Sequence, residues 1–250
     1  MEQFLAALPP PSWAMILVYL RVQAFVLVLP GLGERVLPAR LKVGIAAAMA
    51  PLLTPLAGDP ALPPTTAALA GQAIAELALG LASGMLLRLL ALALDVATTA
   101  IAATASLSQI MGVQNEAAPH PVGNLMHLAG LALLMAMGLP VMLVQLIAHS
   151  LQLWPPAALP DVGYFMSHGP RLVGESFMLA MMLAAPFTIG GFLFQALSGV
   201  VNRVMPALPV VFIGAPASIA LALVGLAVLA PLLVAIWADR ILSFTLPVLP

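Results

Sequence analysis

The chain has 250 residues, of which 63% are hydrophobic and only 7% are charged, and eight basic side chains nearly balance nine acidic ones. So few charges cannot cover the surface of a soluble domain, so the apolar side chains must lie in lipid or against other apolar subunits. The balanced charge excludes a basic surface, so we expect no nucleic-acid partner. Because cysteine is absent, disulfide bonds, thiolate metal ligands and cysteine nucleophiles are excluded.

The N-terminus lacks a positively charged leader, because the chain begins with Met1, Glu2 and Gln3. We therefore expect the first apolar run to be retained. Prolines at positions 9–11 followed by Ser12 predict a helix that begins directly after this serine.

Six apolar runs approach or exceed the ~20 helical residues that cross a bilayer. They cover residues 13–29, 41–56, 67–94, 125–153, 173–201 and 210–236. A seventh, shorter run at 96–112 is rich in Ala, Thr and Ser, which favours a helix packed inside protein. Because proline and glycine clusters close the runs, the pattern predicts an all-α chain of helical hairpins, embedded in a membrane or in an assembly. We expect a single domain over residues 1–250, with N-terminal hairpins in 1–122 and C-terminal hairpins in 123–250.

Ionisable side chains inside apolar runs are costly unless they are paired, so each one marks a functional or assembly contact. This set comprises Arg21, Glu76, Arg88, Asp95 and Glu175, with Arg203 at a corner between two runs. Glu76, Gly80, Gly84 and Arg88 follow one another at i+4, which favours close contact of this face with another helix. The pattern leaves open whether Glu76 and Arg88 pair within one bundle or with another subunit.

Residues for catalysis or metal binding are not grouped in any known pattern. The four histidines, at positions 120, 127, 149 and 168, form no i,i+4 pair and have no carboxylate at metal-site spacing. We interpret His120 and His168 as loop residues, because prolines stand close to them. Gly31-Leu32-Gly33 lacks the third glycine of a dinucleotide site. We therefore expect no enzyme activity, no metal and no cofactor.

Methionine is frequent, with 14 copies, and several of these residues cluster. The clustered ones are Met135, Met137, Met178, Met181 and Met182. We interpret them as core filling, with an adaptable exposed surface as the alternative.

Three groups of motifs follow one another over some two hundred residues. The first comprises Arg21, Pro30-Gly31-Leu32-Gly33 and residues 36–42; the second comprises Glu76, Gly80, Gly84, Asp95 and residues 106–112; the third comprises Ala185-Pro186, residues 198–206 and residues 212–216. Their order and spacing resemble the FliR family of flagellar export proteins, whose counterpart in injectisomes is the SctT family. Ala207 and Pro209 depart from the glutamine and asparagine that this family carries after the arginine-proline corner.

The resemblance implies a subunit of the type III export gate in the bacterial inner membrane, within the flagellar basal body. Such a subunit forms a hetero-oligomer with FliP and FliQ, joined by FlhB and FlhA, at the channel entrance for unfolded export substrates. It also implies that apolar helices contact the lipid bilayer or are lifted from it by assembly.

A pore-closing loop is also implied by the resemblance, at residues 108–121. The residues assigned to it are Ser108, Gln109, Ile110, Met111, Gly112, Val113, Gln114 and Asn115. Uncharged polar side chains, a flexible methionine and a glycine suit a gasket that seals and still moves; the alternative is an ordinary extramembrane loop.

Two alternative functions remain at this point. An injectisome export-gate subunit is a variant of the same hypothesis. A proton- or ion-coupled secondary transporter would also have proline-broken helices, although no cluster of polar residues marks a midplane substrate site.

Overall fold

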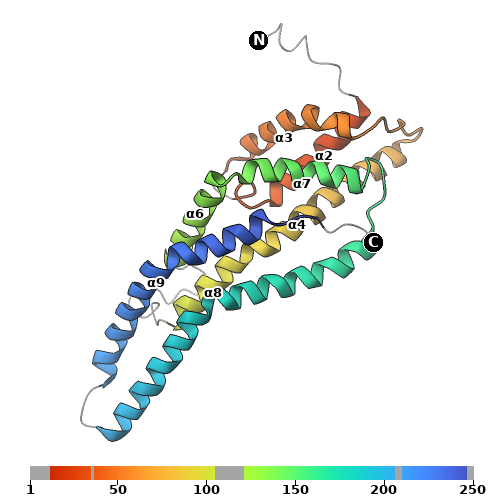
Figure 1. The fold of residues 1–250 in the computed structure, drawn as a ribbon. Coiled ribbons are helices and arrows are strands. Elements are labelled where there is room, and N and C mark those ends of the chain that lie inside the picture. Colours follow the sequence, from red (N-terminus) through yellow and green to blue (C-terminus); the bar gives the residue numbers. More distant parts are fainter. Residues whose placement is uncertain (1–11, 35–36, 105–120, 206–209, 247–250) are drawn as a thin grey trace. The chain divides into compact units, whose positions relative to one another are not determined.

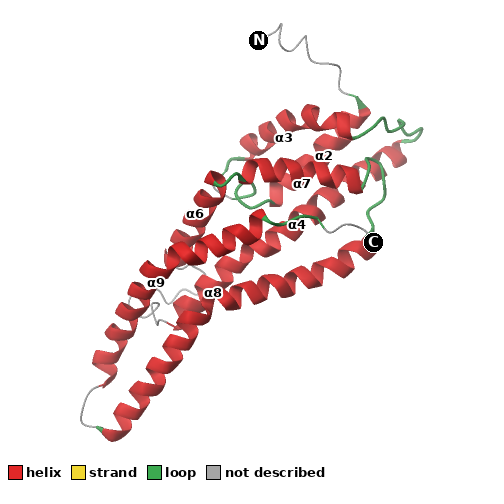
Figure 2. Cartoon of the chain, viewed as in Figure 1, coloured by secondary structure: helices red, strands yellow, loops and turns green. Residues whose placement is uncertain are grey.

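The computed structural model describes residues 12–34, 37–104, 121–205 and 210–246. Within these ranges all regular secondary structure is helical, which confirms the predicted fold class (Figures 1 and 2). The elements are α2 (Trp13–Val28), α3 (Ala39–Leu53), the 3₁₀ turn η1 (Thr54–Leu56), α4 (Thr66–Thr104), α6 (Pro121–Ala136), α7 (Leu139–Leu153), α8 (Val162–Val204) and α9 (Val210–Leu242).

The first described helix, α2, begins where the sequence predicts. Ser12 caps it, because its hydroxyl accepts a hydrogen bond from the amide of Met15 at 3.2 Å. Helix α3 lies beside α2 and follows Pro38 (Figure 1).

Helix boundaries differ from the predicted runs at three places. Residues 67–94 and the start of the seventh run form one helix, α4, because no proline or glycine lies between position 84 and its end at Thr104. The run at 125–153 is instead divided by Gly138, whose φ of 100° favours glycine, and Pro140 then stands in the first turn of α7.

Helix α8 is the third difference, because it begins at Val162 rather than near residue 173. The carboxylate of Asp161 accepts from the amide of Tyr164 at 3.2 Å, so an aspartate cap starts the helix. The helix then continues past Pro170, and His168 therefore lies in a helix; its interpretation as a loop residue was wrong.

Four helical stretches are long and apolar enough to cross a membrane: Ala39–Leu56, Thr66–Ala102, Val162–Val204 and Pro216–Leu242. The broken pair α6 and α7 makes a fifth if it counts as one span. Helix α2, with 16 residues, is shorter than a full span.

The chain forms two compact units, and each uses both halves of the sequence. The first unit contains Met1–Arg88, Gly138–Leu172 and Phe244–Pro250, and the second contains Leu89–Met137 and Val173–Ser243. Whether the chain functions as a single domain stays a prediction.

Candidate functional site

A buried ion pair lies in the first unit, between α2 and α4. Arg21 donates from Nε to Oε2 of Glu76 at 2.6 Å, and both side chains are 0% exposed. A buried charge without a partner is strongly destabilising, so each residue depends on the other.

Backbone groups complete the surroundings of this pair. Nη1 of Arg21 donates to the carbonyls of Ser150 and Trp154 at the end of α7, at 2.9 and 2.7 Å. The other oxygen of Glu76 accepts from the amide of Ala157 at 2.9 Å. The arginine thus satisfies carbonyls that α7 leaves without helical partners, and the ion pair ties three helices together.

Two glycines of α4 let α2 approach closely. A Cβ atom at Gly80 would meet the carbonyl oxygen of Arg21 and lie 2.7 Å from Cβ of Ala24. A Cβ atom at Gly84 would lie 2.5 Å from Cγ2 of Val28. The face that the i+4 spacing predicts to meet another helix therefore meets α2 of the same chain.

Arg88, the last member of that i+4 series, also has a partner within the chain. Its Nη1 donates to Oε1 of Glu34 at 3.0 Å, and both side chains are partly exposed. A tight turn positions Glu34: the amide of Gly33 donates to the carbonyl of Leu29 at 2.7 Å, and a side chain at position 33 would meet that carbonyl. For Glu76 and Arg88, the structure thus shows intramolecular pairing.

The second unit contains two further ion pairs. His127 on α6 lies 2.9 Å from the carboxylate of Asp95 on α4, and Arg240 on α9 donates to Glu175 on α8 at 2.7 Å. Their partners are 32 and 65 residues apart, so no local spacing reveals them. Arg203 lies exposed at the end of α8, with no side-chain partner in the described part of the chain.

Trp237 holds the second unit together at a junction that the sequence analysis missed. Its indole nitrogen donates to the carbonyl of Ala91 at 3.1 Å, and a Cβ atom at Gly130 would lie 2.7 Å from its ring. Ser176 of α8 also donates to a carbonyl of α4, that of Leu89. A tryptophan inside a very apolar helix was the available signal, because a buried indole needs an acceptor.

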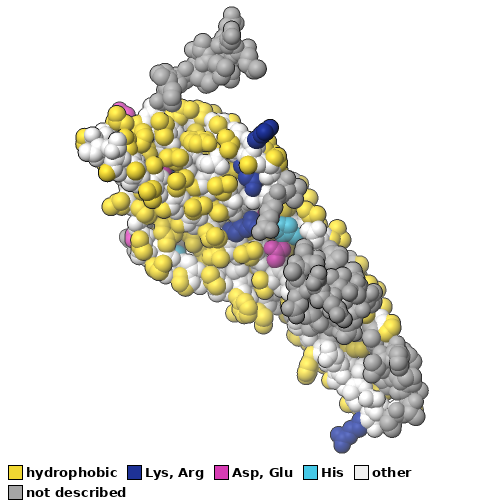
Figure 3. All heavy atoms as spheres, turned by 180° about the vertical axis from the view of Figure 1, so that it is seen from behind, with side chains coloured by type: hydrophobic (Ala, Val, Ile, Leu, Met, Phe, Trp, Pro, Cys, Tyr) yellow, Lys and Arg dark blue, Asp and Glu magenta, His cyan; other side chains and the backbone are white. Residues whose placement is uncertain are grey.

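The clustered methionines are exposed, so the core-filling interpretation was wrong. Their exposed fractions run from 37% at Met135 to 62% at Met182. They belong to a wide apolar surface, and Figure 3 shows hydrophobic side chains over most of the visible face with few charged groups among them. In their most apolar stretches, α8 and α9 have only 28% and 17% of residues buried. Such faces require lipid or protein to cover them.

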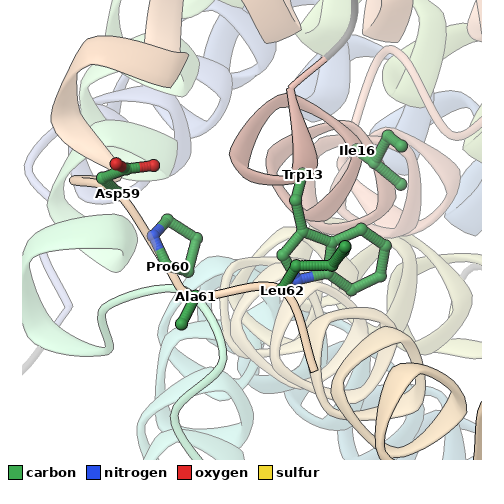
Figure 4. A pocket seen from close by; sticks show the side chains of 6 residues that line it. All are labelled: Trp13, Ile16, Asp59, Pro60, Ala61 and Leu62. Atoms are coloured by element: carbon green, nitrogen blue, oxygen red, sulfur yellow. The ribbon is translucent and has the colours of Figure 1, made fainter. Parts of the chain in front are cut away.

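A shallow hollow of about 640 Å³ opens beside α2 in the first unit. It is lined by Trp13, Ile16 and residues 59–62, with Asp59 standing apart from Trp13 and Ile16 (Figure 4). The indole nitrogen of Trp13 already donates to Gln72 at 2.8 Å. One carboxylate among apolar side chains does not make a catalytic constellation.

Groups of three or more potential metal ligands do not occur among the described residues. The residues assigned to the pore-closing loop, Ser108 to Asn115, lie outside the described ranges, so that assignment stays a prediction.

Comparison with known proteins agrees with the motif order. Residues 12–244 match the family described as bacterial export proteins, family 1. The chain is also 32% identical over 228 residues to the flagellar biosynthetic protein FliR of Caulobacter vibrioides, covering 90% of this chain and 91% of that protein. The chain therefore belongs to the FliR family of bacterial export proteins.

Proposed function

We propose that this chain is a subunit of the flagellar type III export gate in the bacterial inner membrane. In this role it assembles with FliP and FliQ, joined by FlhB and FlhA, into the entrance through which unfolded export substrates pass. The family match over residues 12–244 supports export, and the flagellar relative supports the flagellar rather than the injectisome variant. The role is structural and needs no catalytic residue.

The observation that carries the assembly part of this proposal is the uncovered surface of α8 and α9. Both helices are strongly apolar, with mean hydropathies of 2.0 and 2.9, and yet most of their residues are not buried by this chain. Lipid can cover such a surface on one side of each helix. A helix that is open nearly all around, as α8 is over residues 192–205, offers faces to neighbouring subunits as well.

Family membership also favours export over the ion-coupled transporter. The ion pairs Arg21 with Glu76 and Arg88 with Glu34 are satisfied inside the first unit. Their geometry is that of structural ties between helices, and it leaves these charges no free valence for a transported ion.

Co-expression tests the proposal directly. The chain is produced alone and together with FliP and FliQ of the same bacterium, purified in mild detergent and weighed by native mass spectrometry. The proposal predicts a stable hetero-oligomer that contains this chain. A monomer or homodimer that ignores both partners would overturn it.

The pore-closing role proposed for residues 108–121 has its own test. Shortening this segment should raise ion leakage across the membrane, because the gasket no longer fills the entrance. Leakage is measured as the collapse of a pH gradient in cells that express the full gate. Unchanged leakage and unchanged secretion of flagellar proteins would refute the role.

A further inference from the structure

The C-terminal part of α8, residues 192–204, has two opposite faces of different chemistry. Four large aliphatic side chains recur at spacings of four, three and four residues, which places them on one face. They are Leu193, Leu197, Val200 and Val204, with exposed fractions of 61%, 67%, 61% and 73%. We call them the aliphatic stripe. This face suits the hydrocarbon of a bilayer.

The other face carries Gln195, Gly199 and Asn202, again spaced by four and three residues. We call these three residues the amide stripe. They are offset by two residues from the aliphatic stripe, which is about 200° around a helix, so the two stripes point to opposite sides. All three are exposed.

The amide stripe has no cover within the described part of this chain. Neither the Gln195 nor the Asn202 side chain has a hydrogen-bond partner among the described residues, and a Cβ atom at Gly199 would meet nothing within 4 Å. Amides are poorly suited to hydrocarbon, where nothing satisfies their donors and acceptors. A glycine between two amides, by contrast, is the chemistry by which apolar helices approach each other and hydrogen-bond.

We propose that the amide stripe is the docking face for a helix of another export-gate subunit, while the aliphatic stripe faces lipid. The partner helix carries small side chains that pack on Gly199 and hydrogen-bonding side chains that reach Gln195 and Asn202. This inference rests on the proposed function and adds to it the face of the chain that the partner covers.

The chain offers a matched pair of glycines for the test. Gly190 lies on the same helix, three residues before Leu193 and so on the side of the aliphatic stripe, and a Cβ atom there also meets nothing within 4 Å. Gly199→Leu and Gly190→Leu therefore add the same bulk to one helix on opposite faces, and neither clashes with the chain itself. Both gain equally in helix propensity.

Each variant is co-expressed with FliP and FliQ of the same bacterium, and the yield of hetero-oligomer is measured by native mass spectrometry. Gly199→Leu should lower the yield about tenfold or more, because overpacking at a helix contact is costly, whereas Gly190→Leu should leave it unchanged. Circular dichroism of each variant alone verifies that the helices are retained. The double variant Gln195→Leu, Asn202→Leu should also lower the yield, without adding bulk at the glycine.

The outcomes separate this inference from the proposed function. If the unaltered chain forms no complex, the proposed function fails and the docking face fails with it. If the unaltered chain assembles and Gly199→Leu assembles equally well, the proposed function stands and the docking face is wrong. Equal assembly with altered export would mean that the amide stripe faces water in the channel, which also overturns the inference.

Discussion

Helices α4 and α8 have almost the same mean hydropathy, 2.1 and 2.0, but they are covered in different ways. In its most apolar stretch α4 has 56% of its residues buried by the chain, against 28% for α8. Hydropathy therefore shows that both helices avoid water, and it does not show whether their own chain, another subunit or lipid surrounds them.

Glycines and charges mark the difference between the two helices. Gly80 and Gly84 of α4 are in van der Waals contact with α2, whereas Gly190 and Gly199 of α8 face open space. Glu76 of α4 is paired at 0% exposure, whereas Glu175 of α8 pairs with Arg240 at the surface. The same residue types thus act inside the chain on one helix and are available to partners on the other.

The largest effect should come from breaking the buried ion pair. Arg21→Leu leaves Glu76 charged and buried, and should lower the free energy of unfolding by about 3–5 kcal/mol. The loss is measured by titrating the chain in mild detergent with a denaturing detergent. Arg240→Leu is the control, because its pair is partly exposed, and it should change the free energy by less than about 1 kcal/mol.

A second comparison keeps one partner from being stranded. The double variant Arg21→Met, Glu76→Leu removes both charges and should recover much of the stability that Arg21→Leu loses. Equal losses for Arg21→Leu and Arg240→Leu would contradict the contrast between a covered α4 and an open α8.

An intermediate effect is expected at the contact of α4 with α2. Gly80→Ala places a methyl group against the carbonyl of Arg21, so the helices must move apart at a cost of about 1–3 kcal/mol. Gly71→Ala on the same helix meets nothing within 4 Å and should instead stabilise by about 0.5–1 kcal/mol. The same detergent titration measures both, and a gain at both positions would show that α2 does not pack on Gly80.

A smaller effect should sharpen the account of how Glu76 is held. Ala157, whose amide donates to Glu76, adopts a φ of 70°, which costs a non-glycine residue roughly 1–2 kcal/mol. Ala157→Gly removes this strain and should raise the free energy of unfolding by up to about 1 kcal/mol, after the greater freedom of glycine in the unfolded chain is subtracted. Its neighbour Ala158 does not have a positive φ, so Ala158→Gly should destabilise; a loss at both positions would argue against the strained turn.

Much of the fold follows from the sequence because helix signals in an apolar chain are local. Ser12 marks the start of α2, and the i+4 spacing of Gly80 and Gly84 indicates a packing face. The divided run at Gly138 could not be predicted, because a glycine with a following proline occurs both inside and between apolar helices.

The candidate site was only partly predictable. The sequence identifies Arg21 and Glu76 as ionisable residues that need partners, because the cost of burying a charge is general. It does not pair them, since 55 residues separate them, and it does not reveal the carbonyls of Ser150 and Trp154. The exposure of Met178 and Met182 also depends on tertiary structure, because a methionine suits a core and an open surface equally well.

The most direct test of the central claim places a spin label at position 199 of α8 and, separately, at position 197. Because the chain has no cysteine, each label attaches at a single introduced thiol. Oxygen reaches labels in lipid, a polar nickel complex reaches labels in water, and a label packed against protein is reached by neither. In the complex with FliP and FliQ, the account predicts that neither reagent reaches the label at 199, while oxygen still reaches the label at 197. Equal oxygen access at both positions would contradict it, because α8 would then be covered by lipid all around.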